Sequence, residues 1–154
     1  MSKSEPNYHE PVAPATLARI ASRELLIEHL GTWPTFHDFE VLSLTADRPT
    51  VMGSACDLRA TFLVFDITKP HDDPERRQGT VELFFEQIDG LLIEGFNHQN
   101  PIVGLAITHS EDSDLFQVAW GGSGLLHEVR FTCRRISVLR VVDLNPFRRS
   151  LTCF

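Results

Sequence analysis

Two short polar stretches set in apolar sequence hold the residues of this 154-residue chain that are best suited to chemistry. The first is WPTFHDFE, residues 33–40, in which aromatic residues flank a His-Asp pair. A carboxylate next to an imidazole can orient the ring for proton transfer or metal binding. Neighbouring side chains of an extended chain point to opposite sides, so we expect no direct contact between His37 and Asp38. Asp38 and Glu40 share a face and could together meet one cation or a partner's arginine.

The second stretch is GFNHQNP, residues 95–101, with four consecutive amide or imidazole side chains: Asn97, His98, Gln99 and Asn100. These groups donate and accept hydrogen bonds without a fixed charge, as a recognition loop requires. The alternative is a turn bonded to itself, because asparagine side chains commonly bond to nearby backbone groups. If this loop and the His37 stretch converge at one end of a sheet, the two form a single binding site.

Other motifs do not assemble a catalytic set. The chain has no nucleophile elbow, no HExxH and no CxxC pair, and GGSG at 121–124 lacks the lysine and helix of a phosphate loop, so it predicts a hairpin turn. Cys133 and His127 fall on the apolar face of a predicted strand, which favours an inert thiol and a core histidine. The sequence therefore predicts no enzyme, no metal site and no cofactor.

The elements that must position these residues are mostly strands. Helical spacing of apolar residues predicts one helix over 15–30, which ends at Gly31 and Pro34. Beyond it, short apolar runs alternate with turn residues, and we place the strands at 39–47, 56–66, 80–88, 91–96, 102–109, 115–120, 125–134 and 136–143. This pattern predicts a mainly β fold, an antiparallel β-sandwich or strongly curved sheet of about seven to eight strands with one N-terminal helix.

Alternation within the strands predicts both the core and the surface. Arg130 and Arg134 have the same spacing as Glu82 and Glu86, so we expect their strands to be neighbours with paired charges. The residues predicted to be buried are Trp33, Phe36, Leu42, Leu44, Phe62, Val64, Leu83, Phe85, Val129 and Phe131.

Length and composition favour one domain. With 42% hydrophobic and 23% charged residues, the chain can form one core over 15–154, and residues 1–14, with three prolines, read as a flexible leader. No apolar run is long enough to span a membrane, and the leader lacks the apolar segment of a secretory signal. Three widely spaced cysteines indicate reduced thiols, and with these features we expect a cytoplasmic protein.

The charge is unevenly distributed. Residues 1–120 carry 8 basic and 19 acidic side chains, whereas residues 121–154 carry 6 arginines and two carboxylates, for a net charge of −7. An acidic bulk repels nucleic acid and favours association with basic proteins. We therefore expect a protein partner and neither a nucleic acid nor a membrane.

Three segments in order, WPTFHDFEVLSL, GFNHQN and FTCRRISVLRV, resemble the immunity protein 50 family of bacterial polymorphic toxin systems over about 26–144. The sequence departs from the family pattern at Phe39, where a small residue such as alanine is expected. The resemblance implies a protein that binds and neutralises a cognate toxin domain, such as a basic nuclease, by stoichiometric complex formation, and it brings no catalytic residues. The alternative is a β protein that binds a metal or small ligand, with hydrolytic activity at His37, Asp38 and His98.

Overall fold

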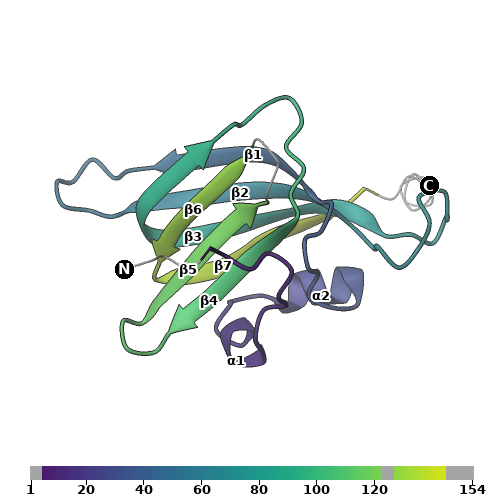
Figure 1. Cartoon of the computed structure of the whole chain (residues 1–154), viewed down its shortest axis with the longest axis horizontal. Helices are drawn as coiled ribbons and strands as arrows, with labels where there is room; N and C mark the ends of the chain where they lie inside the picture. Colours follow the sequence, from purple (N-terminus) through teal and green to yellow (C-terminus); the bar gives the residue numbers. More distant parts are fainter. Residues whose placement is uncertain (1–4, 123–126, 145–154) are drawn as a thin grey trace, which may run out of the picture.

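A long, bent two-stranded ribbon forms the centre of the protein in its computed structural model, which describes residues 5–122 and 127–144 (Figure 1). Strand β3 (Gln78–Glu94) pairs antiparallel with β7 (Arg135–Asp143) through its first half and with β6 (Glu128–Cys133) through its second half. Only Arg134 separates β6 from β7, so the two strands follow one edge of β3 in succession.

Two hairpins extend this ribbon in opposite directions. Strands β1 (Glu40–Asp47) and β2 (Cys56–Phe65) join the other edge of β3 along its first half. Strands β4 (Gly104–Ser110) and β5 (Leu115–Gly121) join the free edge of β6. The described residues thus form a seven-stranded antiparallel sheet that is not closed into a barrel. The prediction of a mainly β, antiparallel fold is confirmed.

The prediction of two separate strands over 80–88 and 91–96 is wrong, because β3 runs through both. Gln87 and Gly90 have positive φ angles of 55° and 65°. The pairing register with β2 shifts across Gln87, and the pairing register with β6 shifts across Gly90. Isolated left-handed residues and bulges bend a strand without reversing it. Asp89-Gly90 therefore makes a bend in one strand and not a hairpin turn.

The single helix predicted over 15–30 is also wrong, since the structure has two short helices. These are α1 (Pro14–Leu17) and α2 (Glu24–Leu30). Ser22 between them has a φ of 57°, a left-handed conformation that ends helical hydrogen bonding. Ala21 instead forms a parallel bridge with β7 and covers part of the outer edge of that strand. No helix among the described residues is long and apolar enough to cross a membrane.

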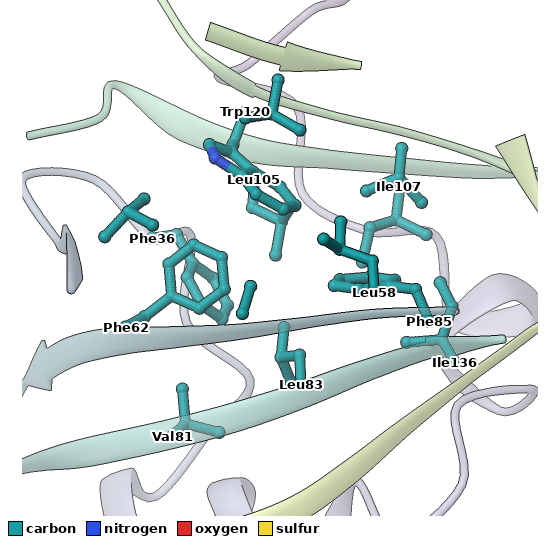
Figure 2. Close-up of a cluster of buried hydrophobic side chains, with 14 of the residues drawn as sticks. Phe36, Leu58, Phe62, Val81, Leu83, Phe85, Leu105, Ile107, Trp120 and Ile136 are labelled. Atoms are coloured by element: carbon teal, nitrogen blue, oxygen red, sulfur yellow. The ribbon is translucent and has the colours of Figure 1, made fainter. Parts of the chain in front are cut away.

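The core lies between the inner faces of the two halves of the sheet (Figure 2). Trp120 of β5 is fully buried, and its ring centre lies 5.2 Å from that of Phe62 and 5.8 Å from those of Phe85 and Phe131. The contacts with Phe62 and Phe131 are edge-to-face, and aromatic contacts of this kind add to the free energy gained from burial. Seven of the residues predicted to be buried are indeed buried: Phe36, Phe62, Val64, Leu83, Phe85, Val129 and Phe131.

The other three predicted core positions differ. Trp33 and Leu44 are only partly buried against the core, and Leu42 is 44% exposed. The cause at Leu42 is a bulge in β1. Val41 lies opposite Phe62 and Ser43 lies opposite the adjacent Thr61, so Leu42 has no partner position in β2. A bulge shifts the alternation of faces, which is why Val41 is fully buried in place of Leu42.

The arginines pair with carboxylates across strands, but the partners differ from those predicted. Glu82 lies opposite Arg140 and Glu86 opposite Arg135, both in β7. The Arg135 guanidinium donates to both carboxylate oxygens of Glu86 at 3.2 Å, and Arg140 lies 3.6 Å from Glu82. Arg130 instead pairs with Glu128 in its own strand. The long β3 changes neighbour at its bend, which strand spacing alone does not reveal.

Candidate functional site

The two polar stretches predicted from the sequence meet at one edge of the sheet. The Asp38 N–H donates to the carbonyl of Ile102 at 3.0 Å, and the Ile102 N–H donates to the carbonyl of Phe39 at 2.9 Å. The Val41 N–H then donates to the carbonyl of Asn100 at 3.0 Å, also beside an antiparallel bridge. The start of β1 is thus joined to the segment before β4, and the expected convergence of the two stretches is observed. We call residues 37–40 and 97–100 the junction.

Asn100 holds the junction together from inside. Its side chain is 3% exposed, and its amide nitrogen donates to the carbonyls of Val41 at 3.1 Å and Asn97 at 2.8 Å. Its amide oxygen accepts the N–H of Asn97 at 2.6 Å, and its own N–H donates to Glu40 at 3.3 Å. A buried amide with this many partners fixes the loop conformation. Asn100 therefore fixes the turn at Asn97 and joins it to Glu40 and Val41.

The rest of the NHQN loop faces solvent. Asn97, His98 and Gln99 are exposed, and the Asn97 side chain donates to the carbonyl of Gly95 at 2.7 Å. Gly95 has a φ of 63°, so the chain leaves β3 through a left-handed turn before it enters the loop. The loop is thus the self-bonded turn that the sequence left as one alternative, through Asn97 and Asn100, while His98 and Gln99 are exposed.

The expectation that His37 and Asp38 point apart is wrong. Phe36 and Asp38 have positive φ angles of 64° and 60°, so the chain here is not extended. The Asp38 carboxylate lies 3.5 Å from Nε2 of His37, while Nδ1 of the same ring lies 3.0 Å from the carbonyl oxygen of Val103. Because the Val103 carbonyl oxygen can only accept, Nδ1 of His37 is the donor in that bond. The side chains of His37 and Asp38 are 50% and 74% exposed, so both can reach a partner.

Aromatic packing explains the unusual backbone at this point. Phe36 is 1% exposed, and its ring meets those of Phe39 and Phe62 edge-on, with centres 5.3 Å apart in both pairs. Phe39 is fully buried in the same cluster. Burial of two aromatic side chains supplies enough free energy to hold left-handed residues in place.

His127 is a core histidine, as predicted, and it lies under the end of β3. Its Nδ1–H donates to the carbonyl of Glu94 at 3.0 Å, and its Nε2 accepts the indole N–H of Trp120 at 3.2 Å. Desolvation lowers the pKa of this ring, and the bond to Glu94 opposes the shift only in part. Phe96 covers the ring edge-on at 5.5 Å. Sequence reasoning places His127 in the core but does not reveal that it anchors the strand leading into the junction.

The thiol of Cys133 is buried, as expected for an inert group. Cys133 is fully buried, and burial raises the pKa of its thiol to about 12. Cys56 is a free, half-buried thiol. Cys153 and the last part of the GGSG turn, residues 123 and 124, lie outside the described residues.

Tyr8 adds a contact that sequence reasoning missed. Its hydroxyl donates to Glu128 at 3.0 Å, beside the ion pair of Glu128 and Arg130. Burial and this bond raise the pKa of the phenol to about 12. Gly104 of β4 lets the Tyr8 backbone approach, because a Cβ at that position would lie 2.1 Å from the Tyr8 carbonyl oxygen. The N-terminal segment thus packs across the outer side of β4 and β6.

Two other features bear on the alternative of a ligand or metal site. Among residues 5–122 and 127–144, no group of three or more His, Cys, Asp and Glu side chains is placed to hold a metal ion. A pocket of about 320 Å³ lies between the N-terminal segment and α2, and its lining includes Val12, Ile27 and Trp33. That lining contains neither His37 nor His98.

Comparison with known proteins leaves the family resemblance as a prediction. The chain matches no protein-family model, no curated protein and no solved structure.

Proposed function

We propose that this protein is an immunity protein, which binds a cognate bacterial toxin domain and neutralises it by forming a stoichiometric complex. The observation that carries the proposal is the junction. Two motifs about sixty residues apart in the sequence, those of the family resemblance, are joined by backbone hydrogen bonds and by the buried Asn100. A surface held in this way is ordered before a partner arrives, so little conformational entropy is lost on binding.

The exposed groups of the junction suit protein recognition. His37, Asp38, Asn97, His98 and Gln99 provide donors, acceptors and one carboxylate. The first two lie beside residues 102 and 103, and the other three precede Asn100 at the opposite end of the paired segment. Partly exposed aromatic and apolar residues lie beside them, since Phe96 is 45% exposed. Interfaces commonly combine an aromatic anchor with surrounding polar groups.

The charge of the molecule supports a basic partner. The net charge is −7, and the imbalance lies in residues 1–120, which include the whole junction. Long-range attraction of this kind speeds the encounter of oppositely charged proteins. A basic toxin domain, such as a nuclease, is the partner that such a surface would favour, and the cytoplasm is the compartment in which this protein would meet it.

The proposal is tested by searching the neighbouring genes for one that encodes a C-terminal toxin domain and by co-expressing that domain with this protein. Wild-type protein should restore growth and co-purify with the toxin in a one-to-one complex. His98→Ala and Asp38→Asn should each weaken the complex by about tenfold, the effect of losing one interface anchor. Asparagine tolerates the left-handed backbone at position 38, so Asp38→Asn removes charge without disturbing the chain.

The matched control is Asp47→Asn at the other end of β1, an equal loss of charge at an exposed position. It should protect as well as the wild type. If no complex forms, and the purified protein instead holds a metal and has hydrolytic activity that His37→Ala abolishes, the metal- or ligand-binding alternative replaces the proposal.

A further inference from the structure

The second half of β3 has an open edge. Strands β6 and β7 occupy one side of β3 along its length, and β2 occupies the other side only as far as Ile88, which lies opposite Cys56. From Asp89 to Glu94, no described strand pairs with β3 on that second side. Figure 1 shows this part of β3 curving away from β2 before the long connection to β4. Backbone groups on such an edge can pair with another chain.

The open edge is apolar and accessible in its middle. Leu92 and Ile93 are 45% and 41% exposed. Leu92 lies opposite Arg130 on the outer face, and Ile93 lies opposite the buried Val129 on the inner face, so both faces of the edge offer apolar contacts. The edge continues directly into Phe96 and the exposed loop of the junction.

Two other edges of the sheet are obstructed in part. Ala21 bridges the outer side of β7 at Ser137. The outer side of β1 is interrupted by the bulge at Leu42 and joined at its start to the junction. Natural proteins use bulges and covering segments of this kind to prevent strand addition. The edge from Asp89 to Glu94 lacks such a cover among the described residues.

The negative charges at the two ends of the open edge determine which kind of strand can pair with it. A second copy that paired over the whole segment, antiparallel about a two-fold axis, would set Asp89 opposite Glu94 of the other copy, twice. Like charges directly opposite each other destabilise a strand pair, and two chains of net charge −7 also repel each other at long range. An extended segment with basic residues at both ends and apolar residues between them has the complementary pattern.

We propose that the edge of β3 from Asp89 to Glu94 binds an extended segment of a partner protein by strand addition, and that this segment has apolar residues flanked by Lys or Arg. The proposal extends the proposed function, and rests on it for the partner's identity, because the edge would supply the backbone contacts of a surface that continues into the junction. Main-chain hydrogen bonds would give affinity, while Leu92, Ile93 and the two carboxylates would give specificity.

The test uses a synthetic octapeptide of the sequence KKVTVTKK and needs no toxin, so its failure is separable from that of the proposed function. The isotopically labelled full-length protein is titrated with the peptide and followed by NMR. Saturable shifts should centre on residues 89–96, and amide exchange there should slow. EEVTVTEE should bind at least about tenfold more weakly, as should a peptide with proline in place of the second valine, which loses a backbone donor.

Protein variants locate the site. Ile93→Lys places a charge at the edge and should weaken peptide binding by about tenfold or more, and Glu94→Lys should do the same. The matched control is Leu139→Lys on β7, where the replaced side chain is 43% exposed and far along the ribbon. It should bind the peptide as the wild type does. The wild-type shift map keeps the test decisive if a variant fails to fold.

Three results would overturn the proposal. The first is the absence of binding at millimolar peptide, which would mean that Asp89 and Glu94 serve only to keep the edge from pairing. The second is a shift map centred elsewhere. The third is a dimer in sedimentation experiments that Ile93→Lys dissociates, because the occupant would then be a second copy of this chain.

Discussion

At the scale of single residues, the described structure separates those that hold the junction from those that a partner can reach. Asn100 is saturated with internal hydrogen bonds, whereas His98 beside it is exposed. Asparagine and histidine are both polar, so the sequence does not separate the roles of these two residues, and only their burial in the structure does. His37 and Asp38 are brought together by left-handed residues that an extended-strand reading does not foresee.

His127 should make the stability of the protein sensitive to pH. Burial lowers the pKa of its ring below the ordinary value of 6.5, so the folded state binds this proton less readily than the unfolded chain. Its contribution to stability is therefore present above pH 6.5 and is lost as the pH falls below that value. A protonated Nε2 could not accept the indole N–H of Trp120.

The measurement is urea unfolding at pH 7.5 and pH 5.5 for the wild type and His127→Gln. The variant should lose less free energy of unfolding between these two pH values than the wild type does. His98→Gln, which removes an exposed histidine, should lose as much as the wild type. An identical pH dependence in the wild type and His127→Gln would contradict this role.

At the scale of elements, the sequence predicted the strands well and their connections poorly. Six of the eight predicted runs of apolar residues are strands within a few residues of the expected limits, because alternation directly reflects a half-buried sheet, and the other two form the single strand β3. The Asp89-Gly90 pair at the bend in β3 predicts a hairpin turn, because Asp-Gly between apolar runs is typical of hairpins. Whether a chain reverses or bends at such a pair depends on which strand lies beside it, and that is a tertiary property.

The same reasoning explains the other errors. The periodicity over 15–30 is helical throughout, but Ala21 gains a bridge to β7 that interrupts it. Leu42 fits the predicted alternation, but a bulge between Val41 and Ser43 turns its side chain towards solvent. At the site, sequence order was enough to predict that the two motifs could converge. The backbone pairing that joins them, and the open edge beside them, depend on contacts across the whole sheet.

The bend in β3 can be tested at Gln87, whose φ of 55° is costly for a residue with a side chain. Gln87→Gly should raise the free energy of unfolding by about 0.5–1 kcal/mol, because glycine adopts this conformation without strain. Gln87→Val should lower it, because β-branched residues tolerate positive φ least. The Gln87 side chain is exposed, and its N–H bond to Asp57 at 2.9 Å remains in both variants. Equal stability of the two variants would argue against the bend.

At the scale of the whole molecule, one bent ribbon arranges the two hairpins so that an apolar core forms between them and a polar junction forms at one edge (Figures 1 and 2). The junction and the open edge of β3 are continuous through Phe96. Both lie within residues 1–120, which hold the excess of acidic side chains. A single basic protein could therefore be attracted by the acidic charge, add a strand to the open edge of β3 and form hydrogen bonds with the junction.

The most direct test of this account is to mix the purified protein with its proposed cognate toxin domain and follow complex formation by stopped-flow fluorescence and calorimetry. The account predicts one-to-one binding and loss of toxin activity in proportion to the complex formed. Raising the salt concentration from about 0.02 M to about 0.5 M should slow association by about tenfold or more and change dissociation much less. No complex with the intact toxin domain, or inactivation of many toxin molecules by one molecule of this protein, would contradict it.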